Sequence, residues 1–309
     1  MSRPVKSLAK SLMVALVMGL SLSSAKAAEL YLIDAHSQID HLVDFSEIVP
    51  LMDKAGIRHV ILAARGKVQP EEITGLAAEF PDRITASART KSRHYADNTP
   101  KYYKLFKKQM RMPGFRAMAE VILWHAKKGH KAPEWVVPPE AKQVRVALKG
   151  AKAKGWPFVI HIEFAATDVR GEFMTKMEAM LENNPDTPFA LIHMGQLEAE
   201  DAGRLLAKHP NFHFLVSHSN PITKAKSKQP WVDLFNNGTS LAPRWKDLFL
   251  KYSDRFILNF DNVFAEHWGD LYVKQAALWR KALAELPADA AHKVAHANAE
   301  RLWKLPTAQ

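Results

Sequence analysis

Residues 157–162 read PFVIHI and residues 187–193 read TPFALIH, with a stretch of helical periodicity between them. Both runs are short, apolar and rich in β-branched or aromatic residues, which is typical of buried strands. A helix between two such strands predicts parallel pairing, because the chain must cross over before the next strand. Each run also brings a histidine to its carboxyl end, His161 in the first and His193 in the second.

The same pattern extends in both directions along the chain. Six further apolar runs predict strands at 30–35, 57–63, 83–88, 118–123, 211–217 and 255–260. Helical patterns lie between them, for example from Asp44 to Lys54, ended by Gly56, and from Pro70 to Phe80. Eight strands alternating with helices predict an α/β protein of the (β/α)8 TIM-barrel type. We expect residues 28–309 to form this single barrel domain.

The first 27 residues differ from the rest of the chain. Arg3, Lys6 and Lys10 precede an apolar run from Leu12 to Leu22, and AKA at 25–27 is a small-residue cleavage site. The apolar run is short for a membrane anchor, so the segment predicts a cleavable signal peptide. We therefore expect export to the periplasm or secretion, with no membrane attachment after cleavage.

Composition narrows the chemistry. The 309 residues include no cysteine, which excludes disulfides, a cysteine nucleophile and thiolate metal sites. The net charge of +11 falls when the signal peptide is removed, because its four basic residues leave 39 basic against 32 acidic. No glycine-rich dinucleotide or P-loop motif follows a strand. A metal, if present, must be held by histidine, carboxylate or amide groups.

Such groups stand at the carboxyl ends of five predicted strands, where a barrel brings them together around one mouth. They are His36 and Gln38 after the first strand, Glu120 in the fourth, His161 in the fifth, His193 in the sixth and Asp261 after the eighth. Imidazole and carboxylate ligands suit divalent ions such as zinc. The joint pattern predicts a metal site, although each residue alone could be a hydrogen-bonded core or helix-capping group.

At these positions the chain resembles the amidohydrolase superfamily, in particular its amidohydrolase-related branch of metal-dependent barrel hydrolases and decarboxylases. The family has H-x-H after strand one, a histidine after strands five and six, and an aspartate after strand eight. This pattern matches His36, His161, His193 and Asp261, and the stretches DRFILNFD (254–261) and ANAERLW (297–303) resemble the family too. The chain departs from the pattern at Gln38, which replaces the second histidine of H-x-H.

The resemblance implies metal-assisted hydrolysis of a C–N or C–O bond in a small molecule. The basic residues at 101–111 and 224–228 favour an anionic over a cationic substrate. His36 and His161, with Gln38 or Glu120, would hold one or two divalent ions, zinc being the expected metal. Asp261 would act as general base, and His193 would bind the metal or polarise the substrate. Glu120 could instead be a surface or outer-sphere carboxylate.

Other interpretations stay open at this point. A decarboxylase of the same superfamily would use the same residues, and Gln38 could mark a barrel that has lost catalysis and only binds a ligand. Cleavage of nucleic acid is a weaker possibility, and we expect no nucleic-acid partner. His218, after the seventh strand, is a candidate substrate-binding residue or a loop cap. The sequence gives no indication of the oligomeric state.

Overall fold

The structure is a computed structural model that describes residue 1 and residues 30–128, 133–166 and 170–307. The predicted signal peptide, residues 1–27, lies outside the described residues apart from Met1. Within the described ranges, no helix is both long and apolar enough to cross a bilayer.

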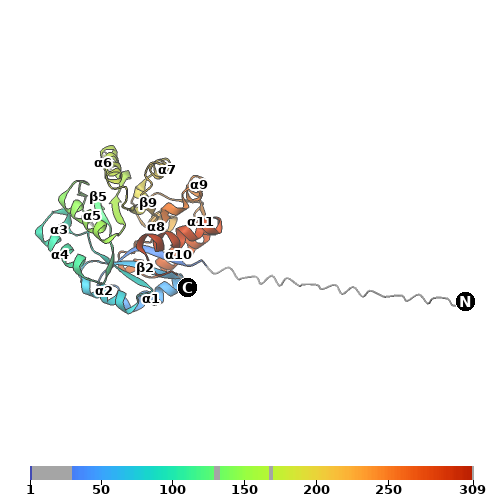
Figure 1. The fold of residues 1–309 in the computed structure, drawn as a ribbon, viewed down its shortest axis with the longest axis horizontal. Helices are drawn as coiled ribbons and strands as arrows, with labels where there is room; N and C mark the ends of the chain where they lie inside the picture. The colour runs from blue at the N-terminus through green and yellow to red at the C-terminus, as the bar shows by residue number, and fades with distance from the viewer. Residues whose placement is uncertain (2–29, 129–132, 167–169, 308–309) are drawn as a thin grey trace.

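Parallel strands form the centre of the molecule (Figure 1). One sheet has the order β1 (Leu32–Ile39), β2 (Ile57–Ala64), β3 (Ile84–Ala88) and β4 (Phe115–Met118). The other runs β12 (Phe256–Ile257), β9 (Phe212–Leu215), β8 (Phe189–Leu191), β7 (Phe158–Ile162), β5 (Val121–His125) and the short antiparallel β6 (Trp135–Val136). The predicted parallel α/β architecture is confirmed.

Strands β4 and β5 are two halves of one barrel strand. Ala119 still donates its N–H to Ala88 of β3, at 3.0 Å, whereas Val121 pairs with Ile160 of β7. Glu120 lies at the change of partner and is buried. The strand predicted at 118–123 therefore spans this break, and the observed strand is longer, from Phe115 to His125. When β4 and β5 are counted as one strand, the parallel strands number eight, as in a (β/α)8 TIM barrel.

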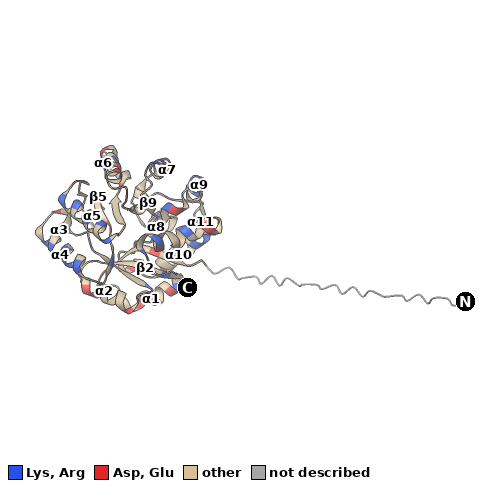
Figure 2. Ribbon diagram, viewed as in Figure 1, with Lys and Arg blue, Asp and Glu red and all other residues tan. Residues whose placement is uncertain are grey.

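Helices surround the strands, and Figure 2 shows both signs of charge distributed over this outer layer. Their bounds are α1 (Ile48–Ala55), α2 (Pro70–Glu79), α3 (Arg93–Ala96), α4 (Pro100–Arg111), α5 (Lys142–Lys154), α6 (Arg170–Glu182), α7 (Ala199–Lys208), α8 (Pro221–Lys226), α9 (Pro243–Lys251), α10 (Asp270–Leu283), α11 (Ala288–His292) and α12 (Asn298–Trp303). A small hairpin, β10 (Phe235–Asn236) with β11 (Ser240–Leu241), follows α8.

The two helices predicted from sequence signals are present. Asp44 caps a 3₁₀ turn (Phe45–Glu47) that leads into α1, and Gly56 ends that helix with a left-handed φ of 65°. Proline begins α2, as predicted, where its missing N–H costs no hydrogen bond.

The carboxyl-terminal helix closes one end of the barrel. Interior side chains such as Ile33, Ile61 and Val159 form one apolar cluster with Leu302 and Trp303 of α12. These strand residues point inward and would otherwise leave an open lumen. The helix therefore seals the amino-terminal end of the strands and leaves the carboxyl ends as the mouth.

The seam between β1 and the segment after β12 is held by backbone hydrogen bonds and one buried carboxylate. Ala35 donates to the carbonyl of Leu258 at 3.1 Å, and Asp261 donates to that of His36 at 2.9 Å. The side chain of Asp34 accepts from the Phe260 N–H and from the Tyr272 hydroxyl, each at 3.0 Å. These bonds fix the first strand beside the last.

Removing the Asp34 carboxylate should therefore weaken the barrel. We expect Asp34→Ala to lower the free energy of unfolding by about 3 kcal/mol, because several buried donors lose their acceptor. Tyr272→Phe removes only one of these bonds and should cost about 1 kcal/mol. Urea denaturation of both variants measures the difference, and an unchanged free energy of unfolding in Asp34→Ala would show that the seam does not depend on Asp34.

Candidate metal centre

The six predicted metal ligands converge at the mouth of the barrel. His36 Nε2 lies 3.5 Å from Asp261 Oδ1 and 3.9 Å from Glu120 Oε1. On the other side of the cluster, His193 Nε2 lies 3.5 Å from Asp261 Oδ2, and His161 Nδ1 lies 2.6 Å from Glu120 Oε2. All these residues and Gln38 are at most 3% exposed. Residues spread over more than two hundred positions thus form one buried polar group.

Three of the site residues sit on left-handed backbone. The φ angles are 57° at His193, 61° at His218 and 49° at Asp261. A non-glycine residue in this region costs roughly 1–2 kcal/mol, and such strain concentrates at functional sites. After His193 the left-handed turn continues through Gly195, where a Cβ would lie 2.5 Å from Leu191 Cδ2. The turn ends β8 abruptly and directs His193 across the mouth.

Glu120 is the electrostatic centre of the cluster. Its carboxylate contacts the Lys91 ammonium and accepts a hydrogen bond from His161. Burial alone would raise the pKa of Glu120, but the charges of Lys91 and His161 outweigh burial and hold the pKa well below its usual value. Burial would lower the pKa of His161, but its charge interaction and hydrogen bond with Glu120 outweigh burial and raise this pKa. Glu120 is therefore a fixed negative charge at neutral pH.

The other groups lose charge in the metal-free protein. Burial, helped by the nearby charge of Glu120, raises the pKa of Asp261 to about 7. Burial also lowers the pKa of His36 to about 4 and that of His193 well below its usual value. Both imidazoles are neutral at pH 7 and offer a nitrogen lone pair, the form that a metal ion requires.

Gln38 joins the two carboxylates. Its Nε2 donates to Asp261 Oδ1 at 2.9 Å and to Glu120 Oε1 at 3.2 Å. The amide nitrogen, rather than the oxygen that would bind a metal, faces the cluster. Its predicted role as a ligand therefore requires the amide to turn over, and that role stays a prediction.

The donor set fits a divalent ion. Among the described residues, four groups at this mouth place their ligand atoms within 4.8 Å of one another: His36, Glu120 and Asp261; Glu120, His161 and His193; His193, His218 and Asp261; and His125, His161 and Glu163. His36 Nε2 is buried and has no hydrogen-bond partner within the described ranges. A buried nitrogen left unpaired between carboxylates is an energetic cost that a bound cation would remove.

His218 lies beside the centre. Its ring stacks on that of His193 with centroids 4.3 Å apart, and its Nε2 is 3.8 Å from Asp261 Oδ2. Trp231 contacts both rings, with centroids 4.8 Å and 5.0 Å away. His218 thus lies at the same mouth as the other candidate residues, and its distance to Asp261 permits metal binding as well as contact with substrate.

Several neighbours of the ligands were not predicted. Glu163 Oε1 lies 3.2 Å from His161 Nε2 and 2.6 Å from the Lys128 ammonium. Ser217 Oγ lies 2.9 Å from His193 Nδ1. The alternation of strand side chains could have revealed Glu163, because residues 161 and 163 face the same side. Lys91, Lys128 and Ser217 carry no such signal, since their positions depend on loop conformation.

Solved structures support the barrel fold. An uncharacterised TIM-barrel protein from Bordetella bronchiseptica is 16% identical and has a TM-score of 0.54, with 85% of this chain and 83% of that one covered. Two others are 12% identical with TM-scores of 0.50. They are 5-carboxyvanillate decarboxylase from Sphingomonas paucimobilis (90% and 100% covered) and an amidohydrolase from Burkholderia multivorans with bound zinc (89% and 100%).

Structures that are only 12–16% identical support the fold but not the family, whereas a family model assigns the family. No curated protein matches the chain. The model described as Amidohydrolase matches residues 58–305, which include every predicted ligand except His36 and Gln38 on β1. With most of the barrel matched, the chain belongs to the amidohydrolase family.

Proposed function

We propose that this protein is an exported, metal-dependent hydrolase that cleaves a C–N or C–O bond in a small anionic molecule. Members of the amidohydrolase family are metal-dependent enzymes that act on small molecules, and the structural neighbours include both hydrolases and a decarboxylase. The observation that carries the proposal is the buried convergence of His36, Glu120, His161, His193 and Asp261.

Zinc is the proposed metal. His36, Glu120 and Asp261 would hold one ion, and His161 and His193 with Glu120 could hold a second. Imidazole nitrogens together with carboxylate oxygens are typical of catalytic zinc sites, and the neighbour from Burkholderia multivorans contains zinc. A bound ion of this kind polarises a substrate oxygen and lowers the pKa of water.

The protein's own side chains would perform the proton transfers. Asp261 projects both carboxylate oxygens into the centre and can accept a proton from water at Oδ1 or Oδ2. It would then return this proton to the leaving group. His193, with Nδ1 held by Ser217, keeps Nε2 directed into the centre, where it can bind an ion or a substrate oxygen.

Two lysines favour an anionic substrate. Lys91 contacts the carboxylate of Glu120. Lys128 forms an ion pair with Glu163, and its ammonium lies 4.9 Å from the Trp231 ring centroid. Both ammonium groups are partly exposed, so they lie between the buried carboxylates and solvent. A substrate carboxylate entering the mouth would meet these two positive charges and the flat face of Trp231.

Metal content tests the first part of the proposal. After dialysis against zinc, the wild-type protein should retain at least one equivalent by elemental analysis, and His36→Ala and Asp261→Asn should retain much less. His292→Ala removes an exposed histidine outside the centre and is the matched control. Equal zinc in all four proteins would place the metal elsewhere.

The reaction type is tested with labelled water. Incubation with amides, esters and lactones of aromatic carboxylic acids in H₂¹⁸O should give a product that contains one ¹⁸O atom, and Asp261→Asn should abolish its formation. Release of carbon dioxide without incorporation of ¹⁸O would instead identify a decarboxylase. Tight ligand binding without any product would identify a binding protein.

Gln38 offers a graded test of the metal site. Replacing the amide by imidazole in Gln38→His restores a stronger zinc ligand and removes the bridge between the carboxylates. We expect zinc affinity to rise by roughly tenfold or more, measured by competition with a chelating dye. Unchanged affinity would mean that residue 38 lies outside the coordination sphere.

A further inference from the structure

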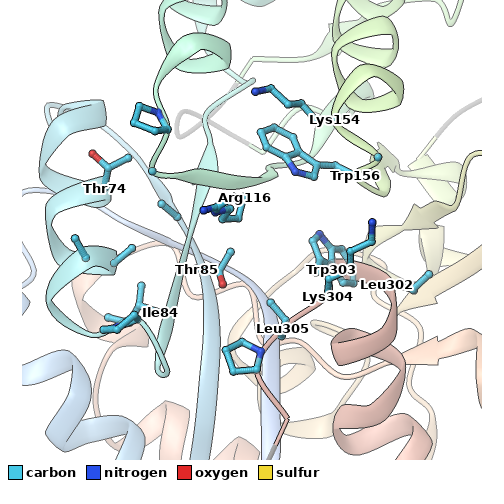
Figure 3. Close-up of a pocket in the computed structure, with 18 residues that line it drawn as sticks. Thr74, Ile84, Thr85, Arg116, Lys154, Trp156, Leu302, Trp303, Lys304 and Leu305 are labelled. Atoms are coloured by element: carbon cyan, nitrogen blue, oxygen red, sulfur yellow. The ribbon is translucent and has the colours of Figure 1, made fainter.

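A cavity lies near the amino-terminal ends of β3 and β4, and none of its lining residues belongs to the metal centre. Figure 3 shows the side chains that line it. It has a volume of about 530 Å³. Its walls come from the first residues of β3 and β4, the turn before β7 and the end of α12. Ile84, Arg116, Trp156 and Trp303 come from these four places. Cavities of this size accommodate small organic molecules.

The charge around this cavity has one sign. Arg116, Lys154 and Lys304 are its charged lining residues, and no aspartate or glutamate lines it. Among the residues that the structure describes, none of these three side chains makes a hydrogen bond or an ion pair. Three cations around one hollow, without a carboxylate partner among the described residues, create a positive potential that attracts an anion.

The walls between the cations are apolar and aromatic. Trp156 and Trp303 face the cavity together with Leu302, Leu305 and Ile84. The indole Nε1 of Trp303 is buried and has no hydrogen-bond partner within the described part of the chain. A buried donor without an acceptor is uncommon, and an acceptor on a bound molecule would satisfy it.

Lys304 occupies a position that favours glycine. It ends α12 with a φ of 53°, in the left-handed region where glycine is the usual helix-ending residue. A lysine there costs stability and brings a positive charge to the cavity rim. Residues that break a local backbone preference, as Lys304 does here, are expected at functional sites.

We propose that this cavity is a second ligand site, which binds a small organic anion with a flat apolar body, such as an aromatic carboxylate or sulfonate. The anionic group would contact Arg116, Lys154 and Lys304, and the ring would pack against Trp156 and Trp303. The site does not depend on the proposed hydrolase function, because it shares no residue with the metal centre.

A pair of fluorescent probes tests the site. The anion 1-anilinonaphthalene-8-sulfonate should bind the folded protein with a dissociation constant that rises with salt. N-phenyl-1-naphthylamine has the same rings without the sulfonate and should bind at least about tenfold more weakly. Asp261→Asn should leave both affinities unchanged, which separates this site from the metal centre.

Variants locate the binding. Lys304→Gly and Arg116→Gln should each weaken binding of the sulfonate at least about fivefold and leave the neutral probe unaffected. Lys304→Gly should also keep or raise the melting temperature, because glycine relieves the left-handed backbone, so weaker binding cannot reflect damage to the fold. Lys152→Gln, on the same helix as Lys154 but outside the cavity, is the matched control.

Three results would overturn the proposal. The first is equal affinity for the charged and neutral probes, which would reduce the cavity to an apolar hollow. The second is sulfonate binding that Lys304→Gly and Arg116→Gln leave unchanged. The third is the absence of sulfonate binding to the folded wild-type protein.

Discussion

The hydrogen bonds that join β1 to the segment after β12 are the constraint on which the metal centre depends. His36 and Gln38 come from the first barrel strand, and Asp261 follows the last one. These residues become neighbours only because Asp34 and the backbone groups at 35–38 pair with residues 258–262. The same bonds that complete the barrel therefore bring the first and last ligands together.

The centre combines charges and strain that a purely structural core would avoid. Glu120 and Asp261 are both fully enclosed, and the positive charge of Lys91, the amide of Gln38 and the raised pKa of Asp261 reduce their repulsion. His193, His218 and Asp261 hold left-handed backbone conformations. Such costs are expected where a protein preorganises groups for a bound cation and are uncommon elsewhere.

The two ends of the barrel differ in a way that suits different ligands. At the mouth, the buried carboxylates of Glu120 and Asp261 lie beside His36 and His193, whose imidazoles are neutral, an arrangement that favours a metal ion. At the sealed end, α12 fills the lumen with apolar side chains and leaves a rim of cations that pair with no carboxylate of the described chain. The end that usually serves stability in such barrels thus has features of a recognition site.

The sequence by itself determined the strand–helix alternation, the eight-strand barrel and the ordered set His36, Glu120, His161, His193 and Asp261. Periodicity and strand ends are local properties, so they can be read without coordinates. Only the tertiary structure decided that Glu120 lies where one strand changes partners, that Gln38 turns its nitrogen to the carboxylates, and that Lys91, Lys128 and Glu163 surround the ligands. Loop conformation and packing between distant segments set these contacts, and a single sequence carries no periodic signal for either.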